Sequence, residues 1–203
     1  MEEYRQLFII PIVHGEADLG SMAASVRARF DQATWAARQE AIDAWWDLVA
    51  NWMRQLPSSV ASRRFSDVQI YQDGMPVDAP ITQIMNQLAT AGSRNHKLLA
   101  EMAELGASIE GTESPELLLK ELEMVKTASE GRGQDPRSQQ RARGLLERRD
   151  RFVGERIGGT LRAGARGVLL IGVAHKVEPS LPADVFVHRP VKPMSTQFLR
   201  QAG

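Results

Sequence analysis

The chain has 203 residues, of which 43% are hydrophobic and 25% are charged, and its 25 basic side chains balance 25 acidic ones. This is the composition of a single globular domain, and the balanced charge does not favour nucleic acid as a partner. The absence of cysteine excludes disulfides and thiolate metal ligands. The opening MEEYRQLFII does not resemble a secretory signal, and no apolar run approaches the roughly 20 residues of a membrane span. We therefore expect a cytoplasmic protein without a membrane partner.

The first elements are a predicted strand and an unusually long predicted helix. A short apolar run at 7–13 predicts a buried strand that ends near His14. Apolar residues then recur every three or four positions from 22 to 56, a segment that lacks Gly and Pro and carries all four tryptophans. Because such a helix would be long for a globular protein, we expect a bend or break within it and an end at Pro57.

Strands and helices alternate along the rest of the chain. The patterns predict strands at 67–74, 107–114, 168–173 and 184–190, and helices at about 80–91, 95–105, from 115 onward, and 138–161. This alternation predicts an α/β fold with a mostly parallel sheet of about five strands and helices on both faces. We assign residues 1–190 to one domain and 191–203 to a C-terminal tail.

Side chains that can bind a metal or a proton lie at or just after four of the predicted strands. His14 and Glu16 follow the first strand, Asp73 and Glu113 lie near the ends of the second and third, and His175 follows the fourth. Parallel sheets bind ligands beyond the carboxyl ends of their strands. Imidazole and carboxylate groups together suit zinc, manganese, iron or cobalt.

This placement predicts a divalent metal site in which His14, Glu16 and His175 are the ligands. Glu113, or alternatively Asp73, would accept a proton from water. Each residue also has an ordinary structural interpretation, because turns and helix starts favour histidine, Asp-Gly pairs and acidic side chains.

The segment LLERRDRFVGERI places Arg149 and Asp150 where the apolar stripe of a predicted helix would continue. A charged pair on such a face must be satisfied, or it costs on the order of several kcal/mol. The pair is either a structural salt bridge, or Arg149 points into the site and stabilises a developing negative charge. Residues 137–166 also contain nine arginines against three acids, which indicates either a solvated helix face or a site for a nucleotide or nucleic acid.

Three short motifs resemble those of the Tiki/TraB-type family, which is grouped with the erythromycin esterases and the haem-binding ChaN-like lipoproteins. Members carry a Gly-x-x-His at the first strand, an Arg-Asn-x-x-Met helix motif and a second Gly-x-x-His. The second Gly-x-x-His is matched by Gly172–His175, and Pro11–His14 matches the first except that Pro replaces Gly. Arg149 matches the helix motif, where Asp150 and Val153 replace Asn and Met. The middle of the chain resembles an uncharacterised bacterial branch of this group.

The resemblance implies an α/β fold with a histidine- and glutamate-lined, metal-dependent hydrolytic site. The leading hypothesis is therefore a metal-dependent hydrolase acting on a small-molecule or peptide substrate. The alternative is a non-catalytic protein that keeps the pocket to bind a small molecule or haem, or to regulate, and Pro11 in place of glycine favours it. The long tryptophan-rich helix is also suited to pairing with a second copy in a homodimer.

Overall fold

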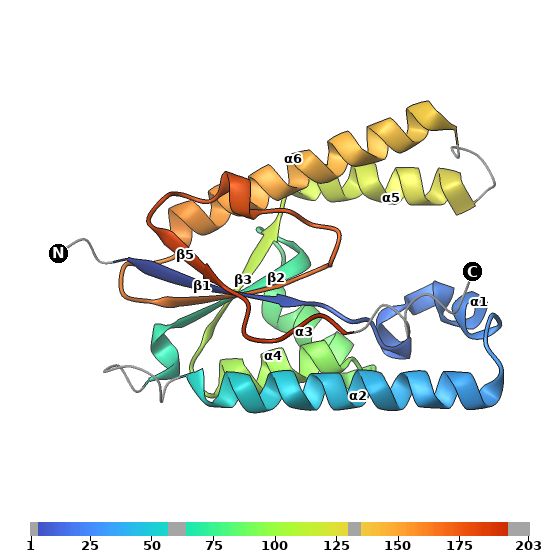
Figure 1. Cartoon of the computed structure of the whole chain (residues 1–203), viewed down its shortest axis with the longest axis horizontal. Coiled ribbons are helices and arrows are strands. Elements are labelled where there is room, and N and C mark those ends of the chain that lie inside the picture. The colour runs from blue at the N-terminus through green and yellow to red at the C-terminus, as the bar shows by residue number, and fades with distance from the viewer. Residues whose placement is uncertain (1–3, 57–63, 130–134, 195–203) are drawn as a thin grey trace.

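The protein is described here by a computed structural model that covers residues 4–56, 64–129 and 135–194, and it confirms the predicted α/β fold (Figure 1). Its sheet contains five parallel strands in the order β3-β2-β4-β1-β5. The strands are β1 (Arg5–Pro11), β2 (Val68–Pro76), β3 (Ser108–Glu113), β4 (Arg166–Ile171) and β5 (Val185–His188). Because all strands run the same way, all five carboxyl ends lie at one edge of the sheet.

Helices cover both faces of this sheet, as expected from the alternating pattern (Figure 1). They are α1 (Ala23–Arg27), α2 (Gln32–Arg54), α3 (Ile81–Thr90), α4 (Arg94–Glu104), α5 (Pro115–Ser129) and α6 (Pro136–Thr160). Helices α2, α3 and α4 lie on one side, while α6 lies on the other with α5 beside it. Alternate residues of β1 therefore enter two cores, with Ile10 packed on the α2 side and Ile9 on the α6 side.

The long helical pattern breaks at Asp31, as its length predicted. Helix α1 ends at Arg27, and α2 begins after Asp31, whose carboxylate accepts the Thr34 N–H at 2.8 Å. A side-chain acceptor at this position satisfies an otherwise unpaired amide of the first turn, which favours a new helix start. The predicted end at Pro57 lies outside the described residues, and α2 itself ends at Arg54.

All four tryptophans lie on α2, as predicted, and Trp46 links this helix to the end of β1. Trp46 is 2% exposed, and its indole N–H donates to the Val13 carbonyl oxygen at 2.9 Å. An indole can be buried at little cost when its N–H has a partner.

The folded core continues a few residues past the boundary expected at 190. Val191 is buried in the α2-side core, and Met194 packs against the same cluster. The rest of the predicted tail, residues 195–203, lies outside the described residues.

Strand β2 contains an irregularity around the Asp73-Gly74 pair, where the strand predicted at 67–74 was expected to end. The strand continues to Pro76, but its pairing with β3 shifts register between Gln72 and Pro76. Gly74 has a φ of 74°, a conformation that glycine adopts without strain. Irregularities of this kind redirect side chains at the ends of sheets, and this one carries Asp73.

The close approach of β2 and β3 at this irregularity yields a stability prediction. A methyl group at Gly111 would collide with the Pro76 carbonyl group and would lie 2.9 Å from the Met75 carbonyl oxygen. Because these are backbone atoms, we expect Gly111→Ala to lower the free energy of unfolding by at least about 2 kcal/mol in urea denaturation. Gly159→Ala on α6 has nothing within 4 Å of the new methyl group, and it should change that free energy by less than about 1 kcal/mol. Equal effects of the two substitutions would contradict the proposed crowding.

Candidate functional site

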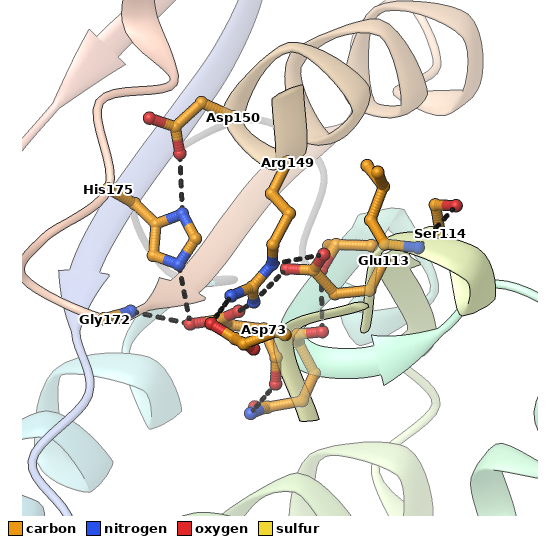
Figure 2. Close-up of polar contacts among 11 residues, drawn as sticks. Asp73, Glu113, Ser114, Arg149, Asp150, Gly172 and His175 are labelled. Carbon is orange, nitrogen blue, oxygen red and sulfur yellow. Dashed lines mark hydrogen bonds and ion pairs between the residues drawn. The ribbon is translucent and has the colours of Figure 1, made fainter. Parts of the chain in front are cut away.

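Three side chains that can bind a metal converge at the carboxyl edge of the sheet (Figure 2). Asp73 comes from the irregular end of β2, Glu113 is the last residue of β3, and His175 follows β4 by four residues. One ligand atom from each lies within 4.8 Å of the other two. In the part of the chain that the structure covers, no other group of three or more histidine or acidic side chains meets this criterion. Asp73, Glu113 and His175 could therefore hold a metal ion.

The orientation of His175 is fixed by Asp150 on α6. The His175 Nδ1 lies 2.6 Å from one Asp150 carboxylate oxygen, and the other oxygen accepts the Lys176 N–H at 2.8 Å. Because an ionised carboxylate can only accept, Nδ1 is the donor of this hydrogen bond, and Nε2 is the ring nitrogen that remains for another partner. Nε2 faces Asp73, with 3.6 Å between Nε2 and the nearer carboxylate oxygen (Figure 2). A carboxylate that orients a histidine in this way is typical of metal-ligating histidines.

A tight turn after β4 brings His175 back toward α6. The His175 N–H donates to the Gly172 carbonyl oxygen at 3.2 Å, and the Gly172 N–H donates to Asp73 at 2.9 Å. The Gly-x-x-His segment recognised in the sequence is thus a turn that ties the end of β4 to the acidic side chain of β2.

Arg149 is buried beside the three candidate ligands and pairs with carboxylates from three different elements. Its Nε and one terminal nitrogen donate to the two oxygens of Glu113 at 3.0 and 2.8 Å. It also reaches Asp73 at 3.1 Å and Glu121 of α5 at 2.5 Å. All three guanidinium nitrogens therefore have carboxylate partners, and Arg149 acts as a link between β2, β3, α5 and α6. One interpretation of the sequence was a salt bridge between Arg149 and its neighbour Asp150. The structure does not contain this salt bridge, because Asp150 pairs with His175 instead.

Burial and the neighbouring charges move the pKa values of the two carboxyl groups in opposite directions. Burial raises the pKa of Glu113, and the nearby Asp73 raises it further, although Arg149 opposes both. Burial also acts to raise the pKa of Asp73, but His175, Glu113, the Gly172 amide and Arg149 outweigh it, so that this pKa is lowered. A proton bound by the pair therefore resides on Glu113, and Asp73 stays ionised.

The site carries more negative than positive groups. The carboxyl groups of Asp73, Glu113 and Asp150 face one permanent cation, the guanidinium of Arg149. The side chains of Glu113 and Arg149 are 0% and 6% exposed, so solvent does little to stabilise their charges. A bound cation or additional protons would offset the excess negative charge, which makes the donor set suitable for a metal ion.

The structure does not bring His14 and Glu16 into this group. His14 is exposed, and its carbonyl oxygen accepts from Arg38 of α2. Glu16 is also exposed and lies in a short 3-10 turn. After β1, the Ile12 N–H donates a hydrogen bond to the Ile171 carbonyl oxygen. The chain then passes to the α2 side of the sheet. His175 instead turns toward α6, so the two histidines contact helices on opposite sides of the sheet.

Of the predicted site residues, the structure thus gathers His175, Asp73, Glu113 and Arg149. Sequence reasoning missed two features of the site. It did not identify Glu121 as a partner of Arg149, and it did not identify Asp150 as the partner of His175. Glu121 gives no local signal, because it looks like any solvated glutamate on an amphipathic helix. The sequence shows Asp150 as a charged residue on the apolar stripe of a helix. Its partner, His175, lies far away in the sequence and is found only from the fold.

A small pocket of about 110 Å³ opens beside His175. Its apolar lining includes Ile9, Pro11, Ile171 and Val177, and its charged lining includes Glu178 and Arg189, which pair with each other. Gly172 and His175 also line this pocket, so it adjoins the candidate site.

No protein-family model, curated protein or solved structure matches the chain. The resemblance to the Tiki/TraB-type family therefore stays a prediction that rests on the three short motifs. Within the described residues, no helix is both long enough and apolar enough to cross a bilayer.

The pairing of Arg149 predicts its contribution to stability. We expect Arg149→Met to lower the free energy of unfolding by about 3 to 5 kcal/mol, because it leaves the Glu113 carboxyl group buried without its cation. The double variant Arg149→Met/Glu113→Gln should recover part of this loss, since the amide needs no counter-charge. Urea denaturation of the two single variants and the double variant measures the coupling. A cost below about 1 kcal/mol for Arg149→Met would show that the guanidinium does not hold the site together.

Proposed function

We propose that the protein is a metal-dependent hydrolase whose divalent ion is held by Asp73, Glu113 and His175. The observation that carries the proposal is the convergence of these three ligand atoms within 4.8 Å, with Nε2 of His175 facing Asp73. Two carboxylates and one imidazole form a donor set suited to manganese, zinc, iron or cobalt.

The spacing of His175 and Asp73 supports a shared ion better than a direct hydrogen bond. Their nearest atoms are 3.6 Å apart, which is beyond the usual range of an N–H···O bond. Two ligand atoms that each lie about 2.1 Å from one ion are roughly 3.4 Å apart at a tetrahedral angle.

Each residue of the site has a role in the proposed chemistry. A divalent ion, when bound, supplies Lewis acidity and lowers the pKa of water that it coordinates. Asp150 keeps the His175 ring in one orientation and one tautomer, and Arg149 fixes Glu113 and Asp73 in position. The side chain of Asp73 is 14% exposed, whereas that of Glu113 is fully buried. Water therefore reaches Asp73 more easily than Glu113, whereas the raised pKa of Glu113 makes that carboxylate the stronger base of the pair.

A second candidate function is a non-catalytic binding or regulatory protein that keeps the pocket. The observation that favours it is the full set of carboxylate partners around Arg149, because a guanidinium paired in this way presents no free donor to a developing oxyanion. The small pocket beside His175 would then hold part of a ligand that is not turned over.

Metal binding is the direct consequence of the proposal. Protein stripped with a chelator should bind Mn²⁺ or Co²⁺ in isothermal titration calorimetry. His175→Ala and Asp73→Asn should each weaken binding more than about a hundredfold, because each removes a ligand atom. Asp150→Asn should weaken it about 10- to 100-fold by releasing the His175 ring.

The exposed histidine His14 provides the matched control. His14→Ala removes the same chemical group at the same sheet edge but outside the proposed ligand set, and it should bind the ion with unchanged affinity. Equal losses in His14→Ala and His175→Ala, or a wild-type protein that binds neither ion, would contradict the proposed site.

Turnover separates the two candidate functions. The metal-loaded protein should hydrolyse at least one member of a panel of ester, amide and phosphoester substrates, and His175→Ala should lower that rate more than about a hundredfold. A protein that binds the ion as described but turns over no member of the panel would favour the binding protein over the hydrolase.

A further inference from the structure

Helices α5 and α6 form a hairpin in which the first half of α6 lies beside α5 and away from the strands (Figure 1). Only the second half of α6 packs on the sheet, through Val153, Ile157 and the following Leu161. The first half is therefore not explained by the core. The first half is also rich in arginine, because it carries four of the nine arginines that the sequence concentrates at 137–166.

Four of these arginines form a stripe on one face of α6. Arg137, Arg141, Arg148 and Arg151 occupy positions i, i+4, i+11 and i+14, which share a face at 3.6 residues per turn. All four are exposed, and the stripe is about 21 Å long at 1.5 Å per residue. The next position on this face is Glu155, which ends the run of positive charge.

The stripe arginines lack the carboxylate partners that other arginines of α6 have. Arg141 donates to the Ser138 hydroxyl, and none of the four pairs with an acidic side chain in the described part of the chain. In contrast, Arg149 and Arg156 are both paired with glutamates. The arginines of α6 are thus divided into a paired set that serves the fold and an unpaired set that faces solvent.

Gly144 lies in the middle of the stripe, at position i+7. Glycine is the poorest helix former after proline, yet a methyl group here would have nothing within 4 Å. Packing within the chain therefore does not require this glycine. The bare backbone leaves room for a ligand to approach the helix between Arg141 and Arg148.

A cleft of about 720 Å³ runs along the stripe between α5 and α6. Its charged lining consists of Lys120, Arg137, Arg141, Arg143 and Arg148 against Glu123 and Glu147. Five basic side chains against two acidic ones give the cleft a positive potential. Guanidinium groups bind phosphates through two parallel hydrogen bonds, which lysine cannot offer.

We propose that this stripe and cleft bind the phosphate backbone of a nucleic acid. A linear row of unpaired guanidinium groups matches a linear row of phosphates, and most of the affinity would come from neutralised phosphate charge. The inference is independent of the proposed hydrolase, because the stripe occupies the face of α6 opposite the one that carries Arg149 and the sheet contacts. The balanced net charge of the chain did not favour nucleic acid as a partner. The proposal differs from that expectation because the positive charge is concentrated on one part of the surface.

The distribution of apolar side chains favours nucleic acid over an anionic membrane. Among the described residues of the two helices, the large apolar side chains that are exposed are Leu119, Leu122 and Val125 on α5. Helical spacing places Leu122 and Val125 on a different face of α5 from Lys120 and Glu123, which line the cleft, and only Leu119 lies one turn before Glu123. A helix that binds a lipid surface needs apolar side chains beside its basic ones, and the stripe has none.

Fluorescence anisotropy with a labelled 20-nucleotide duplex and the matching single strand tests the proposal. Full-length protein should bind at least one of them at 50 mM salt. If the four arginines each neutralise a phosphate of the duplex, affinity should fall about a hundredfold between 50 and 200 mM salt. Arg141→Glu/Arg148→Glu should weaken binding more than tenfold while circular dichroism shows an unchanged fold, because both side chains are exposed.

The matched control is Arg29→Glu/Lys97→Glu, which changes the net charge by the same amount at exposed positions outside the hairpin. It should bind as the wild type does. Absence of binding at 50 mM salt, or an equal loss in the two double variants, would overturn the proposal. Binding to phosphatidylserine vesicles that depends on Arg141 and Arg148, without binding to either oligonucleotide, would overturn it in favour of a membrane surface.

Discussion

The structure depends on the burial of one guanidinium group at the carboxyl edge of the sheet. Arg149 joins Asp73 of β2, Glu113 of β3 and Glu121 of α5, so a single side chain of α6 fixes the positions of three other elements. A buried charge is tolerated only when its partners are in place, which makes the assembly of this edge cooperative. The next residue, Asp150, then fixes His175. Two consecutive residues of one helix thus organise both sides of the candidate site.

Most of the fold follows from local patterns in the sequence. Short apolar runs separated by amphipathic segments predict parallel strands and covering helices, and all five strands are found close to the predicted positions. The break in the long helix was expected from the length of the helical pattern, and Asp31, which accepts the Thr34 N–H, starts the new helix there. Element boundaries were less accurate. The start of α6 at Pro136 precedes the predicted start at 138, since Asp135 caps the helix and proline is well suited to its first turn.

The candidate site was predictable in its location but not in its full membership. Placing ligands at strand ends correctly identified His175, Asp73 and Glu113 as neighbours. It did not distinguish them from His14, because both histidines follow strands that are adjacent in the sheet. The direction in which the chain leaves each strand decides the outcome, and this depends on tertiary contacts such as the bond between Trp46 and Val13. No pattern of the sequence encodes that direction locally.

Helix α6 separates two uses of arginine that the sequence presents as one basic segment. On the inner face, Arg149 and Arg156 are paired and belong to the fold. On the outer face, a row of arginines has no acidic partner in the described structure and surrounds a glycine that packing does not require. A count of charges along the chain cannot separate these two sets, because neighbouring positions on a helix point in different directions.

The most direct test of the central claim is anomalous X-ray diffraction from crystals grown with Mn²⁺. If Asp73, Glu113 and His175 hold the ion, an anomalous peak should appear among these three side chains, and the His175→Ala protein should lack it. A peak bound by other residues, or no peak while Arg149 still bridges Glu113 and Asp73, would contradict the metal site and would leave the cluster as a purely structural element.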